Sequence, residues 1–173
     1  MWRRFGRFDG LGTGAMAAVI GGEPGAIEDA CRAAAGDQVC SVANSNSPNQ
    51  VVIAGNTEAV ERAIELLKGV AKRVIKLNVS APFHCALMRP AQEKLAEHLE
   101  RLTFNMPAVP VVTNVDARVT TAADELRDAL LRQVSAPVRW LESTQLLMQQ
   151  GDTAKAILIL EKAGGSSSTD PAL

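Results

Sequence analysis

A histidine closes the run Val79-Ser80-Ala81-Pro82-Phe83-His84, and it is one of only two histidines in the chain. The run follows an alternating strand pattern and precedes a helical one, so its last side chain can point into a cleft at a strand-to-helix junction. Histidine is the side chain whose ordinary pKa lies between about pH 5 and 8, which suits a general base. A hydrogen-bonded structural histidine is the alternative interpretation, and position alone leaves both open.

The composition indicates a globular chain that does not bind nucleic acid. Of 173 residues, 47% are hydrophobic and 21% are charged, and the net charge is −1. This balance excludes a disordered chain and a protein that binds a polyanion through charge. Aromatic residues make up 3%, with no tyrosine, so the core must consist of aliphatic residues and base stacking is unsupported.

The cysteines predict a reducing compartment and no metal site. Cys31, Cys40 and Cys85 are odd in number and lack metal-ligand spacing, so we expect free thiols. The apolar run from Ala15 to Ile20 is too short for a signal core or a membrane span. We therefore expect a soluble cytoplasmic protein with no membrane partner.

Hydrophobic periodicity in the first half predicts the order β-α-β-β-α-β, which is the split βαβ or ferredoxin-like unit. The connection at 44–49 consists of residue types that favour turns, and the strands on either side of it need not form a tight hairpin. The predicted elements are a strand at 14–20, a helix from Pro24 to Gly36, strands at 39–43 and 50–54, a helix from Asn56 or Thr57 to Gly69, and a strand at 75–79.

The second half predicts an incomplete α/β unit. An amphipathic helix should follow His84, with Pro90 in its first turn or at a kink. Further predictions are a strand at 109–113, helices at 124–134 and 138–148, a buried strand at 156–160 and a disordered Gly/Ser tail. These strands are too few for a complete sheet covered on both faces.

Four segments resemble the malonyl-CoA:acyl carrier protein transacylases of fatty-acid synthesis. They are GTGAMAAVIG at 12–21, NSNSPNQVVIAG at 44–55, PFHCALM at 82–88 and PVVTNVD at 110–116. The resemblance implies an α/β fold in which a ferredoxin-like subdomain is joined to an α/β-hydrolase-like acyltransferase subdomain. The expected divisions are a non-matching segment at 1–11, the ferredoxin-like subdomain at 12–79, part of the hydrolase-like subdomain at 80–160 and a disordered tail at 161–173.

The resemblance also implies a chemistry and a set of site residues. A serine would attack malonyl-CoA and pass the malonyl group to the phosphopantetheine thiol of holo-acyl carrier protein, with no bound cofactor or metal. His84 matches the general base, and Phe83 matches the residue that favours malonyl over bulkier acyl groups. Asn46 and Met16 match positions near the acyl pocket, although Asn46 can equally hold a turn and Met16 can equally fill the core. Cys85 is expected to be inert.

The nucleophile of that chemistry is missing from this sequence. There is no Gly-x-Ser-x-Gly elbow and no Gly-Gln-Gly segment. The family's carboxylate-binding arginine would fall at Met1, and Arg3 and Arg4 are out of register. We therefore expect a frameshifted or truncated chain that is inactive alone, exposes apolar surface, and has the missing N-terminal part of the enzyme as a possible partner.

A binding module without catalysis is the second hypothesis. Lys68, Lys72, Arg73 and Lys76 could face an acidic acyl carrier protein or another subunit, or could simply form a solvated face. An RNA-recognition module with the same order of elements is unsupported, because the predicted strands lack aromatic residues that stack on bases.

Overall fold

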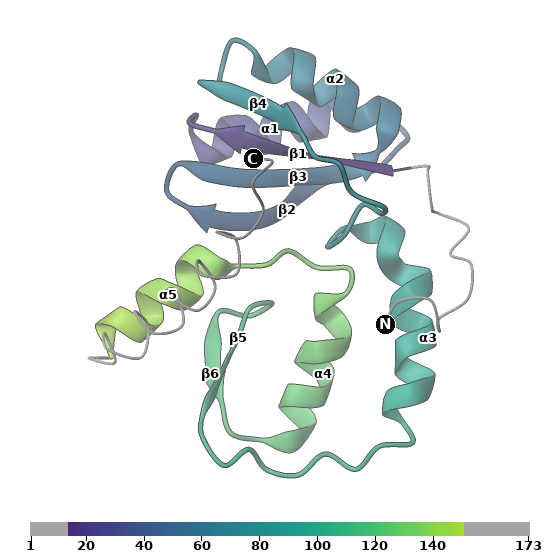
Figure 1. The fold of residues 1–173 in the computed structure, drawn as a ribbon, viewed down its shortest axis with the longest axis vertical. Coiled ribbons are helices and arrows are strands. Elements are labelled where there is room, and N and C mark those ends of the chain that lie inside the picture. The colour runs from purple at the N-terminus through teal and green to yellow at the C-terminus, as the bar shows by residue number, and fades with distance from the viewer. Residues whose placement is uncertain (1–13, 151–173) are drawn as a thin grey trace, which may run out of the picture.

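The computed structural model describes residues 14–150, and these form two connected parts (Figure 1). The predictions for 1–13, for the strand at 156–160 and for the tail at 161–173 lie outside the described residues. The elements are β1 (Gly14–Ile20), α1 (Pro24–Ala35), β2 (Cys40–Ser47), β3 (Gln50–Asn56), α2 (Thr57–Leu67), β4 (Arg73–Lys76), the 3-10 helix η2 (Ala86–Met88), α3 (Arg89–Leu99), β5 (Val111–Thr113), β6 (Arg118–Thr120), α4 (Ala123–Gln133) and α5 (Trp140–Gln149).

The first part is a four-stranded sheet in the order β2-β3-β1-β4, with every neighbouring pair antiparallel. Both connections that carry a helix cross over one intervening strand, which is the arrangement of the split βαβ unit. The predicted order β-α-β-β-α-β is thereby confirmed. β1 lies inside the sheet and is buried almost throughout, as its run of small apolar residues predicts.

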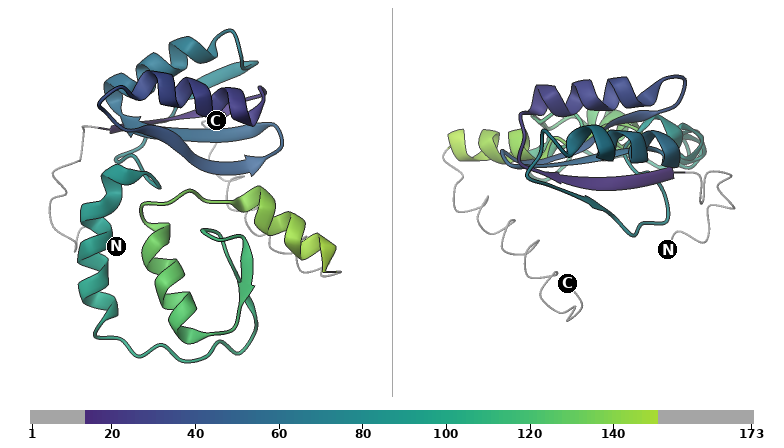
Figure 2. Two further views of the ribbon diagram at one scale, coloured as in Figure 1. Left: turned by 180° about the vertical axis from the view of Figure 1, so that it is seen from behind. Right: turned by 90° about the horizontal axis from the view of Figure 1, so that it is seen from above.

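Helices α1 and α2 cover one face of this sheet (Figure 2). Each presents one apolar stripe, because residues three and four apart lie on the same side of a helix. The buried stripe residues are Ile27, Ala30, Cys31 and Ala34 in α1, and Ala59, Val60, Ala63 and Leu67 in α2. They pack on Ala15, Ala17 and Val19 of β1 and form the main hydrophobic core.

The prediction for the β2–β3 connection was wrong in its extent. β2 continues through Ser47, and only Pro48 and Asn49 form the turn, so the two strands are a tight hairpin. β2 is an edge strand, where polar residues are tolerated. Its pairing with β3 shifts between Val42 and Asn44 and again between Ser45 and Ser47, so two β-bulges take up the extra residues.

The last strand of the sheet lies earlier in the chain than the predicted strand at 75–79, because β4 begins at Arg73 and ends at Lys76. Leu77 N–H still donates to the Met16 carbonyl at 2.9 Å, but the chain then leaves the sheet. Val79 is 37% exposed, so no apolar face holds this end of the alternating pattern in the sheet.

The second part contains η2, the helices α3 to α5 and the two-stranded sheet of β5 and β6. The sequence analysis did not predict β6, and β5 begins two residues later than expected. The predicted helices are confirmed within one or two residues. This part buries few apolar side chains, since α4 buries only Ala129 and α5 only Ser143 and Thr144. Between residues 14 and 150, no helix is long and apolar enough to cross a membrane.

One backbone bridge joins the second part to the free edge of the sheet. Val138 N–H donates to the Ala43 carbonyl at 2.8 Å, and Ser45 N–H donates to the Val138 carbonyl at 2.9 Å. These bonds cover part of the β2 edge, which would otherwise present unpaired backbone groups. The connection between α4 and α5 is thereby fixed against the sheet.

Candidate functional site

The loop that carries His84 is packed tightly against the sheet. Gly14 lies so close to the Pro82 ring that a Cβ at this position would stand 2.3 Å from Pro82 Cγ. The Cys85 thiol is 2% exposed and donates to the Pro82 carbonyl at 3.1 Å. Burial raises the pKa of this thiol, which keeps it protonated and unreactive. Proline and cysteine thus anchor the loop on either side of His84.

His84 itself has an unusual backbone conformation and one defined ring contact. Its φ is 61°, in the left-handed region that few non-glycine residues adopt and that recurs at functional sites. Its Nδ1 atom lies 3.0 Å from the carbonyl oxygen of Gln133. Because a carbonyl can only accept, Nδ1 carries the proton of the neutral ring and Nε2 is left with its lone pair. An imidazole held in this way is ready to take a proton at Nε2.

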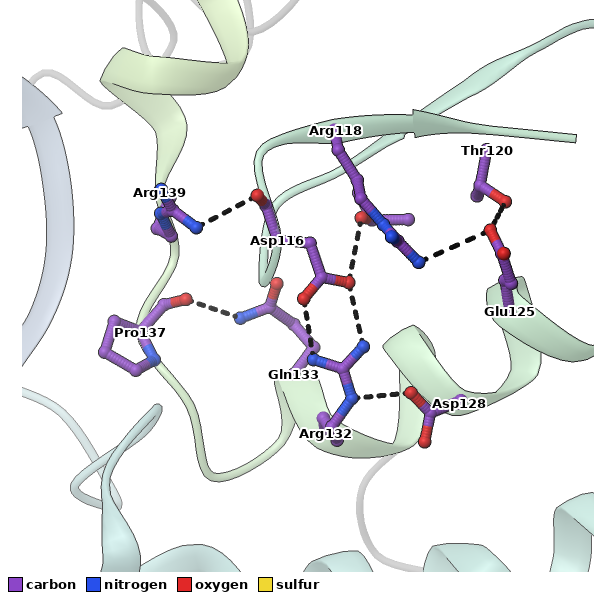
Figure 3. A network of polar contacts seen from close by, with 10 residues as sticks. Asp116, Arg118, Thr120, Glu125, Asp128, Arg132, Gln133, Pro137 and Arg139 are labelled. Atoms are coloured by element: carbon purple, nitrogen blue, oxygen red, sulfur yellow. Dashed lines mark hydrogen bonds and ion pairs between the residues drawn. The ribbon is translucent and has the colours of Figure 1, made fainter.

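The carbonyl that holds His84 belongs to the last residue of α4, where helical carbonyls lack partners within the helix. The adjacent residue, Arg132, binds Asp116 through two parallel hydrogen bonds, Nη1 to Oδ1 and Nη2 to Oδ2, each 2.8 Å long (Figure 3). These bonds lower the pKa of Asp116 and raise that of Arg132, because each favours the charged form of its partner. Asp116 also reaches Arg139, whose Nη1 donates to the Asp116 carbonyl at 2.9 Å.

Met16 lies on the face of the sheet opposite α1 and α2, and Phe83 packs against the same group of apolar side chains. Both belong to a second apolar cluster, in which Met16 is 5% exposed and Phe83 is half-buried. The other buried members are Ala18, Ala43, Val52, Ala54 and Cys85. An apolar wall therefore lies next to the loop of His84, as an acyl pocket would require, and the same packing also suits Met16 as core filler.

Asn46 lies in a strand and not in the turn that the alternative interpretation placed it in. It occupies the second bulge of β2, between Ser45, which pairs with Val51, and Ser47, which pairs with Gln50. Its neighbour Ser45 donates to Val138, five residues beyond Gln133. Asn46 thus lies at the edge of the sheet where the α4–α5 connection passes. Its role near the acyl pocket stays a prediction.

Sequence reasoning did not find the partner of His84. Gln133 contributes a backbone carbonyl, which any residue type could supply, so its sequence carries no signal. Asp116 was part of the quoted segment at 110–116, but its pairing with Arg132 needs the β5–β6 turn to pack on α4. The only available hint was a basic residue in the last turn of a predicted helix, which favours acceptors nearby.

The basic residues of the alternative hypothesis are partly engaged already. Lys68 lies 2.7 Å from Glu65, and Lys76 lies 2.6 Å from Glu61, in both cases on the exposed surface. These contacts place acidic side chains within the basic group, so it offers an acidic partner less net positive charge than the sequence indicates. Among residues 14–150 no group of three or more His, Cys, Asp or Glu side chains could hold a metal ion.

The described fold matches part of the fold of solved acyltransferases. The sequence matches the acyl transferase domain family over residues 1–156, so the chain belongs to this family. The matched range includes 1–11, which the sequence analysis placed outside the resemblance.

Relatives of this chain within the family include malonyl transacylases. The malonyl CoA-acyl carrier protein transacylase of Escherichia coli K12 is 55% identical over 141 residues, which are 81% of this chain and 46% of that protein. The Bacillus subtilis protein of the same name is 41% identical over 144 residues, 82% of this chain and 45% of its own length.

Solved structures agree with these relatives. An acyl carrier protein S-malonyltransferase from Vibrio cholerae has a TM-score of 0.81 at 50% identity, covering 84% of this chain and 48% of that one. A malonyl-transacylase in complex with its type II polyketide synthase acyl carrier protein has a TM-score of 0.82 at 47% identity, covering 86% and 48%. The predicted acyltransferase fold is confirmed, and the chain spans about half the length of the relatives it matches.

Proposed function

We propose that this chain supplies the general base and one wall of the acyl pocket for malonyl transfer. The substrates are malonyl-CoA and the phosphopantetheine thiol of acyl carrier protein. The observation that carries the proposal is the contact of His84 Nδ1 with the Gln133 carbonyl, which leaves Nε2 as the proton acceptor. The names of the relatives, and the complex of one similar structure with its acyl carrier protein, support the choice of substrates.

The reaction proceeds in two transfers with His84 active in both. Nε2 takes the proton of a serine hydroxyl while the oxygen attacks the malonyl thioester carbonyl, and the proton then goes to the departing CoA thiolate. The carrier thiol next gives its proton to Nε2 as its sulfur attacks the malonyl ester, and the serine oxygen recovers the proton. The Gln133 carbonyl, at the C-terminus of α4, stabilises the imidazolium that forms in each step.

The serine must come from a part of the domain that these 173 residues do not contain, because no Gly-x-Ser-x-Gly elbow occurs in them. Several large apolar side chains of the second part are exposed, including Leu102 at 59%, Met106 at 73% and Val109 at 68%. Such surface suits contact with another part of the enzyme.

We place the reaction in the cytoplasm, since the three cysteines are free and buried.

The 173-residue chain alone should transfer no malonyl group. Without the serine, His84 has no hydroxyl to deprotonate and no ester can form. The measurement is transfer of radiolabelled malonyl from malonyl-CoA to holo-acyl carrier protein, with the E. coli relative as the positive control. Transfer that disappears in His84→Ala would mean that a nucleophile within this chain had been overlooked.

Phe83→Ser should relax the selectivity of the assembled enzyme for malonyl over methylmalonyl groups. Phe83 packs against the apolar cluster that contains Met16, and a smaller side chain leaves room for an added methyl group. A methyl-sized change in an apolar pocket alters selectivity by about 10- to 200-fold. The ratio of kcat/KM values for the two CoA esters measures this. Phe104→Ser is the control, because it makes the same change at a partly buried phenylalanine outside this cluster. An unchanged ratio contradicts the role of Phe83.

A chimeric enzyme tests the proposed function. In the E. coli relative, the region matched by this chain is replaced by residues 14–150 of this chain, so that the relative supplies the remainder of the domain. We expect the folded chimera to transfer malonyl from malonyl-CoA to holo-acyl carrier protein. A chimera that folds cooperatively and binds malonyl-CoA but transfers nothing refutes the proposal.

A further inference from the structure

The connection between α4 and α5 is fixed at both of its ends by one residue, Asp116. At the start, the Asp116 carboxylate accepts the two parallel bonds from Arg132. At the end, Arg139 Nη1 donates to the Asp116 carbonyl oxygen at 2.9 Å, and Arg139 N–H donates to the Asn114 carbonyl at 2.9 Å. The turn between β5 and β6 thus holds both ends of the segment 132–139.

The same segment contains the acceptor of the His84 proton. Gln133 follows Arg132 directly, and its carbonyl receives the bond from His84 Nδ1. The Gln133 side chain closes the turn after the helix, donating to the Ala136 carbonyl at 3.0 Å and the Pro137 carbonyl at 3.2 Å. Figure 3 shows Asp116 between the two arginines, with Gln133 beside Arg132. Movement of Arg132 would therefore move the Gln133 carbonyl.

The Arg132–Asp116 contact has the geometry of a strong and directional pair. Parallel bonds between a guanidinium and a carboxylate fix relative orientation as well as distance. The side chains are 38% and 25% exposed, so the pair is partly shielded from water. Thr113 Oγ1 also lies 3.5 Å from Asp116 Oδ2, which restrains the carboxylate from the β5 side. The contact of Arg132 with Asp128 is of another kind, because Asp128 lies on the same helix and is 60% exposed.

We propose that Asp116 is a positioning residue, which acts through Arg132 to hold the Gln133 carbonyl where it fixes the tautomer and orientation of the His84 ring. Asp116 touches no reacting atom, and its effect reaches Nε2 only through the carbonyl and the ring. The catalytic meaning of this role rests on the proposed function of His84. The effect of Asp116 on the tautomer of the His84 ring does not depend on the proposed function, and it can be measured without turnover.

The test is the protonation state of the His84 ring nitrogens in the full chain, labelled with 15N at histidine. Ring 15N shifts at about pH 8, above the ordinary titration range of imidazole, show which nitrogen carries the proton. His98 is the only other histidine and serves as an internal reference, because its Nδ1 lies 2.8 Å from the Lys94 carbonyl on the same helix. In the unchanged chain we expect His84 to carry its proton on Nδ1.

In Asp116→Ala we expect His84 to become a mixture of both tautomers while the His98 shifts stay the same. Asp128→Ala is the matched control, because it removes the other carboxylate from the same guanidinium, and it should leave His84 on Nδ1. If circular dichroism shows that Asp116→Ala does not fold, Asp116→Asn is measured in its place. We then expect a smaller shift of His84 toward the same mixture of tautomers. A folded Asp116 variant whose His84 keeps its proton on Nδ1 overturns the proposal, and so does an equal change in Asp128→Ala.

The two proposals fail separately. If the chimera transfers malonyl but the His84 tautomer is the same in the Asp116 variants, only the positioning role of Asp116 is refuted. If the tautomer changes in the Asp116 variants but the chimera is inactive, the proposed function is refuted and the coupling of Asp116 to His84 stands.

Discussion

His84→Ala lowers malonyl transfer by the chimeric enzyme by about 10² to 10⁴-fold, which is the usual contribution of a positioned general base. The loss falls on kcat/KM, because the imidazole acts on the serine proton in the step that first consumes malonyl-CoA. The apolar cluster that contains Met16 and Phe83, which is the proposed wall of the acyl pocket, stays in place, so binding of malonyl-CoA should change little. Steady-state transfer to holo-acyl carrier protein measures the loss, and a separate equilibrium titration measures the binding.

His98→Ala is the control for this variant. His98 lies on α3, is exposed, and has its Nδ1 near a backbone carbonyl just as His84 does. It is therefore a histidine of similar bonding outside the site, and its loss should leave transfer within about twofold of the unchanged chimera. Equal losses in the two variants would contradict a special role for His84.

Gly55→Ala should destabilise the fold strongly, because the added methyl group has no room between β2 and β3. A Cβ at Gly55 would stand 1.9 Å from the Val39 carbonyl oxygen and 2.8 Å from the Cys40 Cα, both of them backbone atoms. Backbone cannot rotate away as a side chain can, so β2 must separate from β3. We expect a loss of about 3 kcal/mol in the free energy of unfolding, at the upper end of common overpacking costs.

This loss corresponds to a fall of roughly 6–12 °C in Tm for a chain of this length. Gly25→Ala is the matched control, because Gly25 lies in the first turn of α1 with nothing within 4 Å of its added Cβ. Its Tm should stay the same or rise slightly, since alanine favours helices over glycine. Thermal unfolding followed by circular dichroism compares the two, and equal Tm values would show that the β2–β3 pair accommodates the methyl group.

Local pattern was sufficient to predict the sheet and its two helices. The stripes of α1 and α2 and the small apolar run of β1 each bury one continuous surface, so periodicity and burial agree. The errors lie where a strand is exposed at an edge. Asn44 to Ser47 have the composition of a turn, but they pair with β3 because bulges let an edge strand absorb polar residues. Leu77 and Val79 alternate like a strand, but the chain leaves the sheet.

The residue types of the candidate site were proposed from the sequence, and the contacts around them could not be. His84, Met16 and Phe83 were singled out by the family resemblance, and the structure places Met16 and Phe83 in one apolar cluster with Cys85, the neighbour of His84. Their roles in a site stay predictions. The carbonyl of Gln133 was not predictable, because backbone acceptors look alike in every sequence. β6 was missed because Arg118 to Thr120 is short and polar, and its place depends on pairing with β5 alone.

In the proposed function, His84 is the base that activates the serine of a malonyl transacylase. The most direct measurement is the single-turnover rate at which the malonyl ester forms on that serine of the chimera. The reaction is stopped by rapid quench, and the mass of the intact protein reports the ester. We expect rapid acylation in the unchanged chimera, loss of acylation in His84→Ala, and partial recovery when free imidazole is added. Acylation of His84→Ala at the same rate as the unchanged chimera would contradict it.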